Sequence, residues 1–204
     1  FVPAEPSIYR DHMHEGDRQF RRGMYVEALG AYEVALAIFR RGPEIHLSLA
    51  QVNLALGNYY TGCHHIQEAL KYFPELPLAN ISLADFYGQK KDLQVHREKL
   101  LKRLADVEVT GHEWLLVAYV HYYSGNKLQA AIALRRAFVL ARRYKNEALI
   151  EAASIFWDGM VAAGKVTGHL DPARRSTTAA TTRPANSKAD RSPSPALQDP
   201  PAPR

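Results

Sequence analysis

The sequence predicts an all-α protein, an α-solenoid of about four helix-turn-helix repeats plus a C-terminal capping helix, followed by a disordered tail. Three interleaved series of residues share one period of 34 residues, and this self-similarity indicates stacked repeats. A glycine series lapses only at Lys91, a series of small residues does not lapse, and an alanine series lapses only at Arg103. The series are Gly23, Gly57, Gly125 and Gly159; Gly16, Ala50, Ala84, Ala118 and Ala152; and Ala35, Ala69 and Ala137.

The helical repeat domain is expected over residues 9–160, after an N-terminal extension of residues 1–8. Its repeats are 9–42, 43–76, 77–110 and 111–144, and its capping helix is 145–160. Each repeat has two stretches with the apolar spacing of a helix, such as "PEIHLSLAQVNLAL" and "NYYTGCHHIQEALKYF" in the second repeat. The glycine between them permits a tight turn, and Pro74 cannot continue the second helix. Each repeat is therefore predicted to be an antiparallel helix pair.

A set of apolar, small and aromatic residues occupies fixed places in the second repeat. These residues are Leu49, Ala50, Gly57, Tyr59, Gly62, Ile66, Ala69 and Pro74. Related sets occur in the first repeat and in the fourth, which includes Trp114. This pattern resembles the tetratricopeptide repeat (TPR) family, in particular TPR proteins of the bacterial type. The resemblance implies that the first helix of each repeat lines a concave groove that binds a protein or peptide.

The third repeat departs from the TPR pattern. It keeps Leu83, Ala84 and Tyr87, but Lys91 and Arg103 stand where small residues are usual. We expect the second helix of this repeat to be displaced outward or packed differently.

The resemblance also assigns groove positions to each repeat. In the first three repeats they are Arg10, Met13, His14, Asp17, Phe20 and Arg21; Glu44, Leu47, Ser48, Gln51, Leu54 and Ala55; and Leu78, Ile81, Ser82, Asp85, Gly88 and Gln89. In the fourth repeat and the cap they are His112, Leu115, Leu116, Tyr119, Tyr122 and Tyr123; and Leu149, Ile150, Ala153, Phe156 and Trp157. The C-terminal half of the groove is thus expected to be apolar and aromatic.

The candidate peptide-binding residues are taken from these positions. They are Leu115, Leu116, Tyr119, Tyr122, Tyr123, Phe156, Trp157, Asp85 and Gln51. Large rigid side chains with a polar tip anchor peptides well. The predicted function is therefore a non-enzymatic scaffold that binds a protein or peptide segment in the groove. The alternative is that the aromatic residues belong to the core.

A second functional hypothesis is binding of a polyanion or a cell surface. Basic residues recur along "LRRAFVLARRYK" and "HREKLLKRL", which are predicted second helices, and the basic tail would add to them. Acidic residues nearby, such as Glu98 and Glu147, offset these charges. A solvated outer face is the alternative for these helices.

Residues 161–204 are predicted to form the disordered tail, because they are rich in Pro, Ser, Thr and Ala and hold few large apolar residues. Residues 165–204 hold four of the five net positive charges of the chain. Two roles are open for the tail. It is either a solvated tether or an extended segment that lies in the protein's own groove and competes with the partner.

The stretch "TGCHH" puts the only cysteine, Cys63, before His64 and His65, and such side chains are common metal ligands. Neighbouring residues on a helix point about 100° apart, whereas two helical ligands of one metal are three or four residues apart. Glu68 is the one further ligand within reach, so we expect a buried structural cysteine beside surface histidines. No group of nucleophile, base and orienting residue can be picked out, and neither a cofactor nor enzyme activity is expected.

The remaining expectations concern location and partners. No apolar run reaches the length of a membrane span, so a soluble protein without a transmembrane segment is expected. The chain starts at Phe1, so a processed N-terminus is expected, and both the cytoplasm and a bacterial envelope fit. The expected partner is a protein or peptide, without a small-molecule substrate, and nucleic acid is not favoured. A homo-oligomer formed through uncovered ends of the stack is a further alternative.

Overall fold

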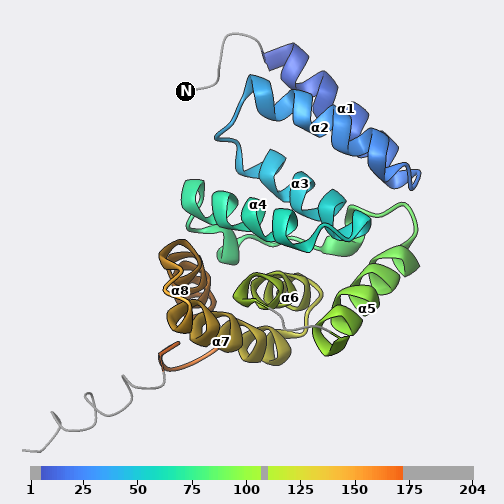
Figure 1. The fold of residues 1–204 in the computed structure, drawn as a ribbon. Coiled ribbons are helices and arrows are strands. Elements are labelled where there is room, and N and C mark those ends of the chain that lie inside the picture. Colours follow the sequence, from blue (N-terminus) through green and yellow to red (C-terminus); the bar gives the residue numbers. More distant parts are fainter. Residues whose placement is uncertain (1–5, 107–109, 172–204) are drawn as a thin grey trace, which may run out of the picture.

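The computed structural model describes residues 6–106 and 110–171, and this part of the chain forms eight α-helices (Figure 1). The helices are α1 (Pro6–Arg21), α2 (Tyr25–Ile38), α3 (Pro43–Leu56), α4 (Tyr59–Tyr72), α5 (Lys90–Asp106), α6 (Gly111–Tyr123), α7 (Lys127–Arg143) and α8 (Glu147–Ala162). Two short 3₁₀ turns, η1 (Leu76–Leu78) and η2 (Leu83–Asp85), lie between α4 and α5. Within the described ranges, no helix is both long and apolar enough to cross a membrane.

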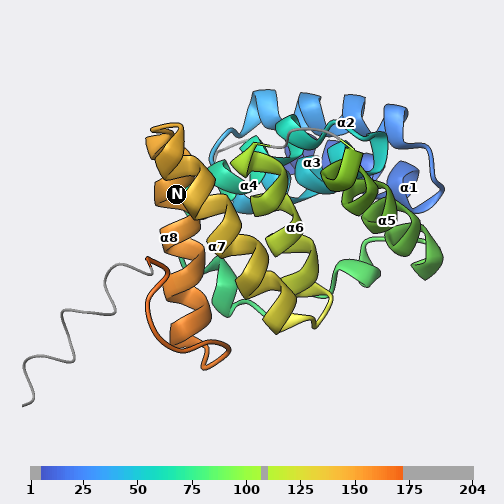
Figure 2. The same cartoon turned by 60° about the horizontal axis from the view of Figure 1, so that its bottom comes forward.

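The helices pack in pairs that follow the order of the chain. Helix α1 packs along α2, α3 along α4, and α6 along α7, while α2 also contacts α3 and α7 contacts α8 (Figures 1 and 2). Short turns inside each pair make its two helices antiparallel. The prediction of an all-α protein built from packed helix pairs is confirmed.

The glycine series marks the turns inside three of the pairs. Gly23, Gly57 and Gly125 have φ angles of 78°, 81° and 85°, a left-handed conformation that glycine adopts without steric cost. The fourth member, Gly159, is different because it lies inside α8. A Cβ atom at this position would lie 2.7 Å from Pro77 Cβ. Gly159 therefore permits close packing of the η1 turn on α8 and does not form a helix-to-helix turn.

The third repeat lacks the first helix that the period predicts. Residues 77–89 contain η2 and part of η1 but no α-helix, so the expected helix pair over 77–110 is corrected to a single helix, α5. Helix α4 packs directly on α6, and α5 lies beside this stack, where it contacts α6 and α3 (Figure 1). The expected outward displacement of the second helix of this repeat agrees with the position of α5.

The irregular segment connects two distant parts of the molecule. Pro77 packs against Gly159 of α8, and a Cβ atom on Gly88 would lie 1.9 Å from the carbonyl oxygen of Arg21 at the end of α1. An α-helix advances about 1.5 Å per residue, whereas an extended chain advances about 3.3 Å. The mostly non-helical path thus lets a short segment reach from α8 to α1.

Small residues allow the helices to approach closely. Ala35, Ala69 and Ala137 of the alanine series are fully buried. A Cβ atom on Gly62 would lie 3.4 Å from the carbonyl oxygen of Ala50 and 3.7 Å from Leu116 Cδ2. Gly62 therefore lies where α4 crosses α3 and α6.

The packed part of the chain extends beyond the expected boundary at residue 161. The indole Nε1–H of Trp157 donates a hydrogen bond of 3.0 Å to the Gly168 carbonyl, and Leu170 is buried. Arg142 of α7 forms an ion pair with Asp171. Residues 163–171 therefore cover the end of α7 and α8. The predictions for the tail after Asp171 concern residues outside the described part of the chain.

Candidate binding clefts

The aromatic residues predicted to form the C-terminal half of the groove make one buried cluster. Tyr119, Tyr122, Tyr123 and Phe156 are all at most 5% exposed. The ring of Tyr123 makes edge contacts with Tyr119 and Tyr122, with centroids 5.2 Å and 5.0 Å apart, and Tyr122 contacts Phe156 at 5.3 Å. Edge-to-face contacts at these distances are favourable. Their burial agrees with the alternative that assigns these residues to the core.

This aromatic cluster holds a segment of the chain itself. The Tyr122 hydroxyl donates a hydrogen bond of 2.6 Å to the carbonyl of Pro77, and the Tyr123 hydroxyl donates one of 2.6 Å to the carbonyl of Leu76. Burial raises the pKa of both tyrosines, so their hydroxyls stay protonated and remain donors. Residues of the predicted groove thus fix the η1 turn.

Gln51 is also engaged inside the protein. Its amide nitrogen donates to the Tyr119 hydroxyl at 2.9 Å, and its amide oxygen accepts from the Tyr87 hydroxyl at 3.4 Å. The Tyr87 ring lies 4.9 Å from that of Phe20. Gln51 therefore joins α3 to α6 and to the segment after η2, and it is not open to a partner.

The other candidate residues divide into buried and exposed ones. Leu115 and Leu116 are fully buried in α6, and Trp157 is 2% exposed, with its indole ring under the guanidinium of Arg135 at 4.8 Å. Asp85 is the one candidate residue that is exposed. An open aromatic groove is thus not present in residues 6–106 and 110–171.

A second set of predicted groove positions does surround a cleft. This cleft has a volume of about 340 Å³ and lies between α1, α3 and the η2 turn. We call it the acidic cleft, and its lining residues are Met13, Asp17, Arg21, Tyr32, Glu44, Leu47, Ser48, Asp85 and Phe86. Seven of these nine residues, all except Tyr32 and Phe86, are groove positions of the TPR pattern. Residues from three predicted repeats therefore meet here.

Three carboxylates and one guanidinium line the acidic cleft. Asp17 accepts a hydrogen bond of 2.8 Å from the Tyr32 hydroxyl, and Glu44 accepts one of 2.8 Å from the Tyr9 hydroxyl. These bonds fix the two carboxylates while leaving each with further acceptor sites. Asp85, on the η2 turn, is exposed and also lines the cleft. The lining thus has a net negative charge.

The floor of the acidic cleft is partly apolar. Leu47 is 7% exposed, and Met13 and Phe86 are half-buried. A ligand binds this lining most tightly if it carries a positive charge together with an apolar part, as Lys and Arg side chains do.

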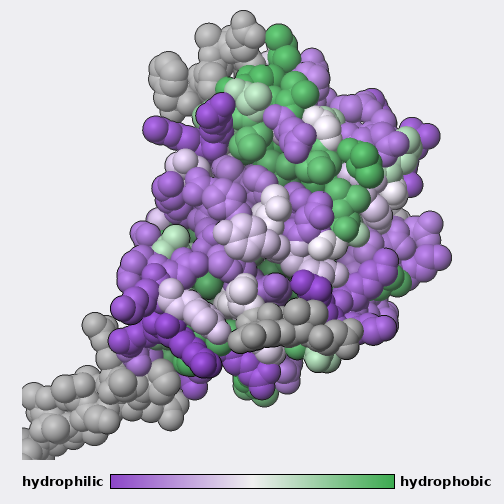
Figure 3. Space-filling view, viewed as in Figure 1, coloured by the Kyte–Doolittle hydropathy of each residue, from purple (hydrophilic) through white to green (hydrophobic). Residues whose placement is uncertain are grey.

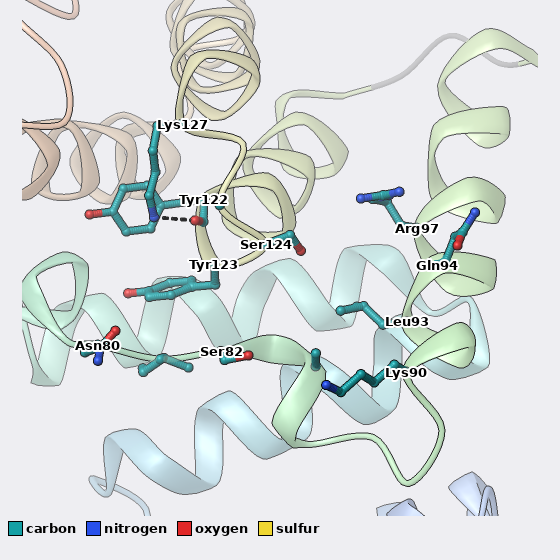
Figure 4. A pocket seen from close by; sticks show the side chains of 13 residues that line it. Asn80, Ser82, Lys90, Leu93, Gln94, Arg97, Tyr122, Tyr123, Ser124 and Lys127 are labelled. Carbon is teal, nitrogen blue, oxygen red and sulfur yellow. Dashed lines mark hydrogen bonds between the residues drawn. The ribbon is translucent and has the colours of Figure 1, made fainter.

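A second cleft lies on the other side of η2, between residues 80–84, α5 and the end of α6 (Figure 4). It has a volume of about 530 Å³, and we call it the basic cleft. Its lining residues are Asn80, Ile81, Ser82, Ala84, Lys90, Leu93, Gln94, Arg97, Tyr122, Tyr123, Ser124, Gly125 and Lys127. Ser82 and Ala84 line this cleft, whereas Asp85 and Phe86 line the acidic one, so the η2 turn separates the two.

The TGCHH stretch lies in α4, where Thr61 and His64 are exposed and its other three residues are buried. Cys63 is fully buried, and burial raises its pKa well above the usual value, so the thiol stays protonated. The prediction of two surface histidines is correct for His64 and wrong for His65, which is 9% exposed and contacts His46 of α3. Among the described residues, no three His, Cys, Asp or Glu side chains come together as metal ligands would.

The arginines of α7, which motivate the polyanion hypothesis, lie against aromatic rings of the chain. Arg136 is 4.5 Å from the ring centroid of Trp114, and Arg143 is 5.8 Å from that of Tyr144. Such cation–π contacts hold the guanidinium groups close to the protein surface.

An apolar stripe is exposed on α2. Val26, Val34 and Ile38 are 69%, 43% and 36% exposed, and a hydrophobic patch lies over the α1–α2 pair in Figure 3. Surfaces of this kind often mark contact sites between proteins.

A scan of the sequence against protein-family models finds no match, and a search of curated proteins finds none either.

Proposed function

We propose that this protein is a non-enzymatic interaction module with TPR-like repeats, and that it binds a basic, extended segment of a partner protein in the acidic cleft. The single observation that carries the proposal is the composition of that cleft. Groove positions from three successive repeats surround it, and three of them are carboxylates.

The TPR-like assignment is supported by the repeat geometry. Positive φ angles recur at Gly23 and Gly57 with the spacing of one repeat, and again at Gly125 after two repeats. The third repeat is incomplete, and η2 stands in the chain where its first helix is predicted. Asp85 is carried into the acidic cleft by this turn.

The charge of the cleft specifies the class of partner. Asp17, Glu44 and Asp85 outnumber Arg21, so a segment with Lys or Arg side chains is attracted and an acidic one is repelled. The buried position of the aromatic cluster moves the proposed site from the C-terminal half of the groove to the N-terminal half. Tyr122 and Tyr123 serve this site indirectly, because they fix the η1 turn of the segment that carries η2.

The test is a selection of peptides from a random displayed library on the full chain. Peptides rich in Lys and Arg are the expected product, and they should bind the Asp17→Asn, Asp85→Asn double variant at least tenfold more weakly, because close charge pairs contribute about 1.5 kcal/mol or more. Glu33→Gln on the outer face of α2 is the control, since Glu33 is exposed and does not line the cleft. The proposal would be contradicted if the selected peptides carried no Lys or Arg. It would also be contradicted if they bound the double variant as tightly as the parent chain.

A further inference from the structure

The basic cleft differs from the acidic one in charge and in its supporting elements. Lys90 and Arg97 come from α5, and Lys127 comes from the start of α7. Its volume of about 530 Å³ is within the range of small-molecule sites. Figure 4 shows Arg97 and Lys90 pointing from α5 across the cleft, toward the side where Ser124 and Ser82 lie.

The positive charges of the basic cleft have no counter-charge in its lining. None of the described lining residues is acidic, and none of the three cations forms a salt bridge with a described residue. The ammonium of Lys127 is fixed, because it donates to the Tyr122 carbonyl and lies 3.6 Å from the centroid of the Tyr122 ring. The lining therefore combines three cations from two elements.

Uncharged donors complete the site. The Ser124 hydroxyl oxygen is buried and has no hydrogen-bond partner among the described residues, although buried hydroxyls are usually paired. The Ser82 hydroxyl and the Asn80 amide line the same cleft, as does the Gln94 amide, which also donates a hydrogen bond of 2.9 Å to Glu98. Helix α5 begins at Lys90, so the positive end of its dipole lies at the edge of the cleft.

We propose that the basic cleft binds the phosphate group of a small phosphorylated molecule. A phosphate monoester carries a charge of about −1.5 to −2 and three strong acceptor oxygens. Three cations and several neutral donors suit such a group better than they suit a single carboxylate. The Arg97 guanidinium can offer two parallel N–H groups to two phosphate oxygens, whereas Lys90 and Lys127 act as point charges. This site does not depend on the proposed function of the acidic cleft.

The test is a titration of the full chain with inorganic phosphate, followed by nuclear magnetic resonance of the backbone amides. We expect saturable shifts at Ser82, Arg97 and Ser124. Arg97→Gln and Lys90→Gln should each weaken binding about tenfold, the usual size of one hydrogen bond to a charged group. Lys102→Gln removes the same charge from an exposed position of α5 outside the cleft, so it should bind phosphate as the parent chain does.

Two outcomes of the phosphate titration would overturn the proposal. One is the absence of saturable shifts at these three residues. The other is equal weakening by Lys102→Gln, which would indicate general charge screening. Circular dichroism spectra of the variants should match that of the parent chain. Ser124→Ala is a further variant, which removes a hydroxyl without changing the charge. A phosphoserine peptide that binds more tightly than free O-phosphoserine would contradict the assignment to a small molecule.

Discussion

His46 Nδ1 lies 3.1 Å from His65 Nδ1, and both imidazole rings are buried where α3 packs on α4. His46 Nε2 lies 2.9 Å from the Arg40 carbonyl, which can only accept, so Nε2 carries the proton. Nδ1 of a neutral His46 then accepts from the Nδ1–H of His65. The contact therefore excludes protonation of both rings at once, because two protonated rings would place N–H groups against each other.

This histidine pair predicts a loss of stability in mild acid. Burial, with repulsion from His46 and His64, lowers the pKa of His65 to about 4, and burial also lowers the pKa of His46 despite the nearby Glu68 and Glu44. The unfolded chain, with histidine pKa values near 6.5, binds more protons below that pH. The stabilisation is therefore complete above about pH 6.5 and falls as the pH approaches 4.

Urea unfolding at pH 7.5 and pH 5 measures this effect. We expect the free energy of unfolding to drop by about 1 to 2 kcal/mol more in the parent chain than in a His65→Asn variant, which cannot be protonated. Comparing the two chains cancels the titration of the carboxylates. An equal drop in both chains would show that the His46–His65 contact is not the acid-sensitive element.

The packing of η1 on α8 predicts opposite effects for two glycine-to-alanine changes. Gly159→Ala forces Pro77 away from α8 and should lower the free energy of unfolding by about 1 to 3 kcal/mol, as overpacking does. Gly30→Ala in α2 has open space and should raise it by about 0.5 to 1 kcal/mol through helix propensity alone. Thermal unfolding of both variants checks the pair. A stabilised Gly159→Ala variant would contradict the close contact with Pro77.

The tyrosine hydroxyls that hold η1 predict a second stability effect. Tyr122→Phe and Tyr123→Phe each leave a carbonyl of the segment without its donor, so each should cost about 1 to 2 kcal/mol. Tyr60→Phe is the matched control, because the Tyr60 side chain is 65% exposed. Chemical unfolding of the three variants gives the comparison. Equal stability of all three would mean that these two bonds add nothing to the fold.

The regular part of the fold could be predicted from local signals. Apolar spacing and the turn glycines Gly23, Gly57 and Gly125 act within a repeat, so the helix pairs around them follow from the sequence. Gly159 has the same spacing but a different role, because the contact that requires it comes from Pro77, distant in the sequence. Periodicity alone does not distinguish a glycine that turns the chain from one that admits a neighbour.

The site could be predicted only in part, for a related reason. Residues 77–89 have helix-like spacing, but the bond from Tyr122 to Pro77 and the close approach of Gly88 to Arg21 hold them in another path. That path buries the predicted aromatic groove and brings Asp85 to the acidic cleft. The lapse of the glycine series at Lys91 was the available signal for an irregular third repeat. The basic cleft was missed, since it exists only because that segment is not a helix.

The most direct measurement is a charge-swap cycle between Asp85 and a selected basic peptide. Asp85 is exposed on the η2 turn, so Asp85→Lys changes the charge of the acidic cleft without altering the core. We predict that Asp85→Lys weakens the peptide at least tenfold, and that one Arg→Glu change in the peptide restores most of the affinity for that variant alone. Binding in the acidic cleft would be contradicted if the peptide bound Asp85→Lys as tightly as the parent chain. It would also be contradicted if no Arg→Glu or Lys→Glu change in the peptide restored its affinity for that variant.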